Sequence, residues 1–253
     1  MQKLSGILLC SLIALGVPVS SARAQALDPA LVDKGKQLFN DPKLSASGQV
    51  SCATCHPMNG HTDNKTYIGL DIVADGDPKG RSTPTLWGAG MRSAYSWAGT
   101  APSMEANIRG IIVNRMKGAE PAPETLAALV AYVRSLGTQQ SPDIGKDGTP
   151  VKSAPDAIKR GFDLFVGKGG CGTCHVLPTF DKAEIEDIGS DGKFKVPSLW
   201  AVSKSGPWFH DGRYKTLGEA VTSMWEFQTK KAGQPSSPSA TELADLLEYL
   251  SAL

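Results

Sequence analysis

The sequence has almost no net charge and, beyond its N-terminus, no long apolar run. Lysine and arginine number 26 against 25 acidic residues, which gives a formal net charge of +1. A chain so balanced has no global attraction for nucleic acid or for an anionic membrane surface. No later apolar run approaches the roughly 20 residues of a membrane-spanning helix. We therefore expect a mature protein that is soluble, has no membrane span and binds no nucleic acid.

The N-terminus itself has the pattern of a cleaved secretory signal. Lys3 precedes an apolar run from Ile7 to Val19, and Ala22-Arg23-Ala24 fits the small-x-small rule of a signal peptidase site. We interpret residues 1–24 as the signal peptide. A lipid anchor on Cys10 is the alternative, and it is disfavoured because too little apolar sequence precedes that cysteine.

Cysteine is scarce, and four of the five cysteines fall in two short motifs. These are Cys52-Ala53-Thr54-Cys55-His56 and Cys171-Gly172-Thr173-Cys174-His175. C-x-x-C-H is the attachment signature of c-type haem, in which two thiols bond covalently to the porphyrin and the adjacent histidine ligates the iron. We expect two covalently bound haem c groups, attached through Cys52, Cys55, Cys171 and Cys174 and ligated by His56 and His175.

Two other uses of Cys-x-x-Cys pairs fit less well. A zinc site would not usually place a histidine directly after each pair, and a thioredoxin-like dithiol would sit in a βαβ pattern that is absent here. Because haem takes all four remaining cysteines, no disulfide is expected. Haem attachment of this type takes place outside the cytoplasm, so together with the signal it predicts a periplasmic protein.

The mature chain contains the same helical unit twice. Amphipathic helices open the units over residues 29–40 and 157–166 and close them over residues 123–136 and 240–253. Gly35 or Gly161 would let each opening helix cross closely over its closing helix, where Tyr132 or Tyr249 supplies an aromatic contact. The pattern resembles the class I cytochrome c fold used twice, in a mostly α protein whose two tandem domains each surround one haem.

A repeat at an offset of 113 residues supports a tandem duplication. Arg81 to Trp87 matches Phe194 to Trp200, and the same offset relates Trp97 to His210. The stretch from Gly137 to Pro155 is rich in Gly, Ser, Pro and Asp and indicates a linker. The predicted organisation is a signal peptide (1–24), an N-terminal cytochrome c domain (25–138), a linker (139–154) and a C-terminal cytochrome c domain (155–253).

The C-terminal unit resembles a known family over the stretch from Ser205 to Met224. It contains Trp208-Phe209-His210-Asp211-Gly212-Arg213 and is similar to the electron-entry domain of the bacterial di-haem cytochrome c peroxidases, whose relatives include the methylamine-utilisation haem enzyme. In that family a methionine fourteen residues after the histidine of the H-x-G motif ligates the iron. Met224 matches this position, so the resemblance implies that Met224 is a ligand and that His210 is structural. A core methionine at helical spacing is the alternative.

The N-terminal unit carries the resemblance further but departs from it at catalytic positions. Trp97-Ala98-Gly99 falls at the W-x-G motif, whose tryptophan lies between the haems in the family, although ordinary packing would place Trp97 similarly. A histidine that caps the resting iron is replaced by Ile72, a glutamine by Asn107 and a glutamate by Arg115. Losing the carboxylate removes the natural acid/base. Arg115 either stabilises a developing anion or is an exposed residue of an amphipathic helix. The catalytic candidates are Trp97, Asn107 and Arg115.

The sixth coordination position of the first haem has no clear ligand in the sequence. His61 and Met58 follow His56 too closely to cross the porphyrin. The register of Met224 is occupied in the first unit by Ile111. Three further methionines are expected to be core residues: Met91, Met104 and Met116. We therefore expect an open or weakly ligated iron at His56.

Calcium at the domain interface is a further implication of the resemblance. The family uses an asparagine side chain and backbone carbonyls as ligands. Here Ser82 replaces the asparagine, and Ser205 and Pro207 stand at the carbonyl positions. Because serine reaches less far and has no amide carbonyl, calcium is suggested only weakly.

Two functions of different classes remain open. In the first, electrons enter at the haem of His175 and Met224, pass by Trp97 and reduce hydrogen peroxide or a similar small oxidant at the haem of His56. In the second, the protein is a non-catalytic carrier serving a periplasmic dehydrogenase or respiratory complex. Oxidation of a protein or organic substrate has no specific support. We favour the enzyme because an uncapped haem is reactive. Expected electron donors are a small cytochrome, a cupredoxin or a dehydrogenase, and the family's frequent dimers make a homodimer an expectation to test.

Overall fold

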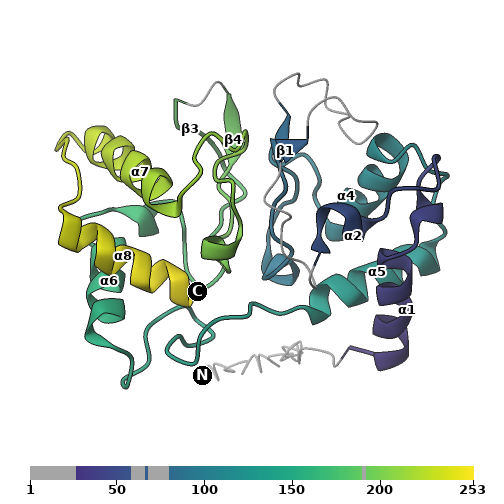
Figure 1. Ribbon diagram of the computed structural model, residues 1–253, viewed down its shortest axis with the longest axis horizontal. Coiled ribbons are helices and arrows are strands. Elements are labelled where there is room, and N and C mark those ends of the chain that lie inside the picture. The colour runs from purple at the N-terminus through teal and green to yellow at the C-terminus, as the bar shows by residue number, and fades with distance from the viewer. Residues whose placement is uncertain (1–26, 58–65, 68–79, 190–191) are drawn as a thin grey trace, which may run out of the picture.

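The computed structural model describes residues 27–57, 66–67, 80–189 and 192–253 (Figure 1). Helices predominate, and the strands form two small antiparallel two-stranded ribbons. None of the helices in these ranges is long and apolar enough to span a membrane. The predicted signal peptide, together with Cys10, Met58, His61 and Ile72, lies outside the described residues.

The N-terminal half (residues 27–138) is built on two crossed helices. α1 (Pro29–Phe39) packs against α5 (Pro123–Ser135). Strand β1 (Thr66–Tyr67) pairs with β2 (Arg81–Ser82). The remaining short elements are the 3-10 turns η1 (Pro42–Leu44) and η2 (Ala89–Met91), the helices α2 (Cys52–Cys55) and α4 (Met104–Gly110), and the π-helical turn η3 (Ile111–Arg115).

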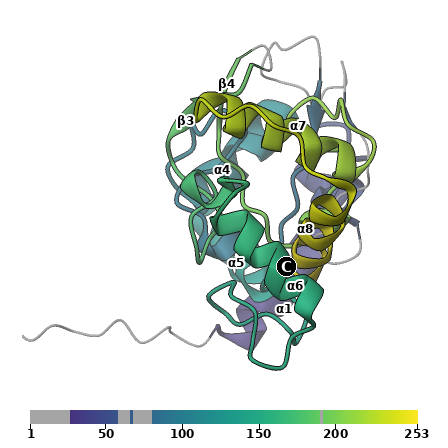
Figure 2. The ribbon, with the colours of Figure 1, turned by 90° about the vertical axis from the view of Figure 1, so that its left-hand side faces the viewer.

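The C-terminal half (residues 139–253) repeats this plan. α6 (Asp156–Val166) packs against α8 (Ala240–Ala252), and α8 lies between α6 and α7 (Leu217–Lys231) (Figure 2). Strand β3 (Ile185–Asp187) pairs with β4 (Lys193–Lys195). The 3-10 turns are η4 (Cys171–Thr173) and η5 (Val202–Lys204). Residues 137–155 contain no helix or strand, and Ile144 and Ala154 of this stretch are buried in the C-terminal core cluster.

The helix crossings are close because each opening helix has a glycine at the contact. A Cβ at Gly35 would collide with the carbonyl of Ala128, and one at Gly161 with the carbonyl of Asp245. Gly35 and Gly161 also lie against the Cβ atoms of the tyrosines on α5 and α8. The predicted helix pairs are confirmed. At the start of α1 the Asp28 carboxylate accepts the Ala30 N–H at 2.9 Å and caps the helix.

The repeat at an offset of 113 residues is also confirmed in the loops. Gly99 and Gly212 are equivalent, with φ angles of 67° and 66°, a region that glycine adopts without a steric cost. Each lies inside a loop closed by an isolated antiparallel bridge. The bridges join Tyr95 to Ala101 and Trp208 to Tyr214.

The two halves meet through a pair of backbone hydrogen bonds whose residues are related by the offset of 113. Ser82 N–H donates to the His210 carbonyl at 2.8 Å, and Lys195 N–H donates to the Trp97 carbonyl at 2.9 Å. Ser82 is equivalent to Lys195, and Trp97 is equivalent to His210. The junction is therefore pseudo-two-fold, with equivalent surfaces of the two halves facing each other. Figure 1 shows the halves side by side, with β1 and β4 at the junction.

Candidate functional site

A cavity of about 250 Å³ lies beside the second Cys-x-x-Cys-His motif, lined mostly by the C-terminal half and on one side by residues between 82 and 97 of the N-terminal half. Its walls include the four side chains predicted to hold the second haem. Apolar residues surround these donors, among them Phe165, Val221 and Leu246. The site residues Cys171, Cys174, His175 and Met224 therefore share one enclosed apolar space. Two thiols, an imidazole and a thioether around such a space fit the requirements of a His/Met haem c.

The imidazole of His175 is held for metal ligation by its backbone contacts. Its Nδ1 lies 3.0 Å from the Phe180 carbonyl and 3.0 Å from the Pro197 carbonyl. Because both partners are acceptors, Nδ1 must carry the proton, and Nε2 keeps its lone pair for a metal. Burial is the main cause that lowers the pKa of His175, and this favours the neutral ring that a metal requires.

The thiols are not set up as a redox dithiol. Burial raises the pKa of Cys52 and of Cys171 to about 12. A reactive thiolate needs a lowered pKa, so these pairs differ physically from catalytic Cys-x-x-Cys motifs. The four cysteines at 52, 55, 171 and 174 form no disulfide. Both observations favour covalent attachment of a cofactor over dithiol chemistry.

The first motif differs from the second in the environment of its histidine. Ser51 and Thr54 form a capping box that starts α2 at the first cysteine of the motif. His56 follows α2, and its buried Nδ1 has no hydrogen-bond partner among the described residues. Burial, followed by the charge of Arg92, lowers the pKa of His56 to about 4. Among the described residues, carbonyls therefore hold the ring of His175 and none holds the ring of His56, although their sequence motifs are alike.

The helices that carry the distal positions begin alike and then diverge. Ser103 caps α4 by accepting the Ala106 N–H, and the equivalent Thr216 caps α7 by accepting the Glu219 N–H. α7 continues as a regular helix past Met224, which faces the cavity. The chain after α4 instead widens into the π-helical turn η3 at Ile111, which packs against the N-terminal core.

Of the three methionines predicted to be core residues in the N-terminal half, two are confirmed, and the prediction is wrong for Met91. Met104 and Met116 are buried in its hydrophobic core cluster, and Met91 is exposed at the end of η2. Neither core methionine lies at the register of Met224. Within the described residues, the N-terminal half thus offers no thioether equivalent to Met224.

Trp97 lies at the junction between the halves and lines the C-terminal cavity. Its indole Nε1 donates to the Ser82 carbonyl at 2.9 Å, and its ring meets His210 edge-on at 6.3 Å between centroids. His210 is buried and stacks on Phe194 at 3.7 Å. The backbone and ring contacts fix the orientation of the indole between the halves, and His210 has the structural environment that was predicted.

Asn107 and Arg115 lie on the α4–η3 segment. Both side chains are half-buried, so Arg115 is more enclosed than an exposed residue of an amphipathic helix would be. Glu105, the one carboxylate on this segment, is exposed. No buried acid therefore replaces the glutamate that the family resemblance led us to look for here.

The residues at the expected calcium position do not fit that ion. The Ser82 hydroxyl donates directly to the Pro207 carbonyl at 2.6 Å, so the two atoms that would have been ligands bind each other. Nowhere in the described ranges do three or more metal-binding side chains gather in a group able to hold a metal ion. A direct hydrogen bond takes the place of a metal bridge at this point of the junction.

One charged cluster near the cavity was missed by the sequence analysis. Arg92, Asp181 and Lys195 come together from both halves, and the last two are buried. Charged residues are usually solvated, and these three are widely separated in sequence, so no motif or periodic pattern marks them.

The sequence of this chain is similar to the sequences of known proteins. The sequence model described as di-haem cytochrome c peroxidase matches residues 29–138. The methylamine utilization protein MauG of Methylorubrum extorquens is 32% identical over 291 aligned positions, covering 93% of this chain and 81% of that protein. Cytochrome c551 peroxidase of Pseudomonas aeruginosa is 28% identical, covering 86% of this chain and 78% of that protein.

Solved structures share the fold at lower sequence identity. Hydrazine synthase of Kuenenia stuttgartiensis superposes with a TM-score of 0.72 at 22% identity, over 100% of this chain and 98% of that one. The diheme peroxidase BthA of Burkholderia thailandensis gives 0.65 at 17% identity, over 89% of this chain and 86% of that one.

Proposed function

The chain belongs to the di-haem cytochrome c peroxidase family, and from that premise we propose that it is a periplasmic oxidoreductase that reduces hydrogen peroxide or a similar small oxidant. It would consist of two cytochrome c-like domains, residues 25–138 and 155–253, joined by the linker 139–154. The observation that carries the proposal is the asymmetry between Met224, which faces its cavity, and Ile111, which occupies the same register of the other half.

The C-terminal half is the proposed entry point for electrons. Cys171 and Cys174 would attach the porphyrin covalently, and His175 and Met224 would ligate its iron. A bound haem supplies one-electron redox chemistry, and where an axial position is open it also activates a small oxidant. The thioether of Met224 favours the reduced state, so this half suits the acceptance of electrons from a small cytochrome, a cupredoxin or a dehydrogenase.

Trp97 would connect the two halves. Its ring is held by the Ser82 carbonyl on one side and faces His210 on the other. A fixed indole at this point offers electrons a polarisable path across the junction between the halves. The hydrogen bonds Ser82 to His210 and Lys195 to Trp97 keep the halves from separating around it.

The N-terminal half is the proposed site of peroxide reduction. Cys52 and Cys55 would attach the porphyrin and His56 would ligate its iron, while Ile111 supplies no thioether at the register of Met224. Reduction of peroxide consumes two electrons and two protons, breaks the O–O bond and yields two water molecules. Asn107 can orient the oxidant by hydrogen bonds, and the Arg115 guanidinium can stabilise developing negative charge. Because the α4–η3 segment carries no buried acid, protons would come from solvent, so turnover should be slower than carboxylate-assisted chemistry.

A di-haem electron carrier is the second candidate. The observation that favours it is the absence of a buried carboxylate on the α4–η3 segment. Such a carrier would pass electrons between a dehydrogenase and a respiratory complex without binding peroxide.

Optical and paramagnetic spectra of the as-isolated and half-reduced protein separate the two functions. The enzyme requires one high-spin haem that binds cyanide, together with peroxide consumption when a donor is supplied. Two low-spin haems that bind no cyanide and consume no peroxide would refute the enzyme and support the carrier.

A further inference from the structure

Three buried or half-buried charged residues surround the boundary between the halves. Lys195 Nζ lies 3.5 Å from Asp181 Oδ2 and donates to the Val196 carbonyl at 3.0 Å. Both side chains of this ion pair are buried, at 6% and 1% exposure. Arg92 reaches the same region from the N-terminal half, and it interacts electrostatically with both. The cluster therefore holds two positive charges against one negative charge.

Arg92 contacts only carbonyl oxygens in its present surroundings. Its Nη2 donates to the Thr85 carbonyl at 2.7 Å and to the Trp87 carbonyl at 3.2 Å. Its Nε is buried and has no hydrogen-bond partner. No carboxylate of the described residues lies within ion-pair distance of this guanidinium. Arginine stays charged in proteins, and a desolvated guanidinium that no anion contacts directly is unfavourable even with Asp181 nearby.

Both cations of the cluster line the cavity of the C-terminal half. Arg92 and Lys195 line the same cavity as Cys171, His175 and Met224. The one carboxylate among the lining residues, Glu186, already pairs with Lys231 at 3.2 Å. A molecule bound in this cavity would thus contact two positively charged side chains and no carboxylate that lacks an ion-pair partner. Its own anionic groups would supply the missing partner.

We infer that Arg92 and Lys195 form a carboxylate-binding site for the propionate groups of the porphyrin held in the C-terminal cavity. The inference rests on the proposed function, which places a haem there. Arg92 lines the cavity, and a planar guanidinium suits a carboxylate, which it can bind through two parallel hydrogen bonds. The anchor for the C-terminal cofactor then comes from the N-terminal half.

This arrangement gives Arg92 a positioning role with an electrochemical consequence. The ferric state of a haem carries one more positive charge than the ferrous state, so a neighbouring cation favours reduction. Removing the cation, or leaving a propionate without its partner, favours the ferric state. Arg92 would thereby help to keep the Met224-ligated half electron-accepting while it ties the cofactor to the junction.

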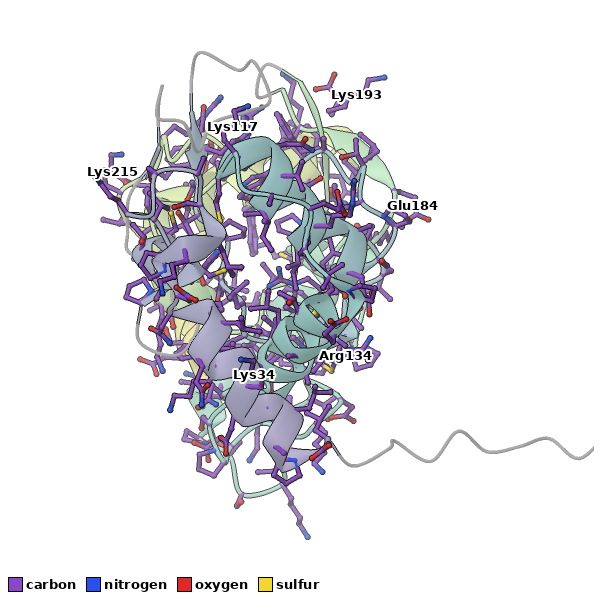
Figure 3. The ribbon with its side chains drawn as sticks, turned by 90° about the vertical axis from the view of Figure 1, so that its right-hand side faces the viewer. Lys34, Lys117, Arg134, Glu184, Lys193 and Lys215 are labelled. Carbon is purple, nitrogen blue, oxygen red and sulfur yellow. The ribbon has the colours of Figure 1, made fainter. Side chains whose placement is uncertain are left out.

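The test compares three variants of the holoprotein. Arg92→Gln removes the charge, Arg92→Lys keeps the charge without the planar fork, and Lys34→Gln removes one charge from the exposed face of α1 (Figure 3). Haem content is measured first by intact mass. Each variant then gives a resonance Raman spectrum, read at the propionate bending band, and a midpoint potential for each haem.

We expect Arg92→Gln to shift the propionate band. We also expect the ferric-to-ferrous ratio of the C-terminal haem to rise tenfold, which lowers its midpoint potential by about 59 mV for one electron. Arg92→Lys should keep most of the potential and still shift the band. Lys34→Gln should change neither. A band and potential in Arg92→Gln equal to those of Lys34→Gln would overturn the inference. If Arg92→Gln does not fold, an unshifted band in Arg92→Lys would overturn it equally. Fewer than two haems in the unmodified protein would instead refute the proposed function.

Discussion

The crossing of α6 and α8 gives a stability prediction that can be worked out from the coordinates. In Gly161→Ala the new methyl group collides with the backbone carbonyl of Asp245 and crowds the Cβ of Tyr249. A backbone atom cannot rotate away, so the helices must separate. Overpacking of this kind costs about 1–3 kcal/mol, with a backbone clash at the upper end. Alanine regains about 0.5–1 kcal/mol of helix propensity. The net expectation is a loss of about 2 kcal/mol.

Gly218→Ala is the matched control, because it adds the same methyl group to a helix in the same half. Its Cβ would meet Leu247 Cδ1 at 3.8 Å, an ordinary contact. We expect it to be neutral or stabilising by up to about 1 kcal/mol. Guanidinium unfolding of the holoproteins, followed by circular dichroism and by the haem absorbance, measures both. If Gly161→Ala is as stable as the unmodified protein, the close crossing does not constrain α6 and α8 as argued.

Four further predictions address ligation, metal content and pH. Met224→His should lower the potential of the C-terminal haem and abolish the near-infrared sulfur-to-iron band, and a band that persists would show the ligand assignment to be wrong. Ile111→Met should suppress cyanide binding at the N-terminal haem, because the new thioether would occupy the open position. Val113→Met, on the same turn, should leave cyanide binding unchanged. Equal cyanide affinity in the two variants would place Ile111 away from the iron. Prolonged chelation with EDTA should leave the unfolding midpoint unchanged, since the junction is closed by the Ser82 hydroxyl, and a lowered midpoint restored by calcium would contradict this. The Arg160 guanidinium lowers the pKa of Asp245. This carboxylate therefore stabilises the fold above its ordinary pKa and loses that contribution as the pH falls through the lowered value. Asp245→Asn should flatten this part of the profile of stability against pH in acid titrations, and an unchanged profile would exclude the pair as its source.

The helices could be predicted because their signals are local. Periodic apolar residues and the glycines at the crossings each act over one or two turns, and the structure confirms the helix pairs that they predicted. The offset of 113 residues was equally readable, because a duplicated loop keeps its turn glycines. It correctly anticipated that Trp97 and His210 occupy equivalent positions at the junction.

Other features could not be predicted because they depend on tertiary packing, either within one half or between the halves. The π-helical turn at Ile111 follows an ordinary helical sequence, and no residue in it marks the widened backbone. The half-burial of Arg115 follows from that turn. The cluster of Arg92, Asp181 and Lys195 forms only when the halves meet, so it has no sequence pattern to find. The different surroundings of His56 and His175 likewise depend on how the loops fold back, because the carbonyls of Phe180 and Pro197 reach His175 only in the folded chain.

Anaerobic mixing of the fully reduced protein with one equivalent of hydrogen peroxide tests the central claim most directly. The account predicts that both haems are oxidised in a rapid reaction, with two electrons transferred for each peroxide consumed, and that prior addition of cyanide prevents it. A protein that stays reduced, or that oxidises no faster than a His/Met cytochrome with no open coordination position, would contradict peroxide reduction at the N-terminal half.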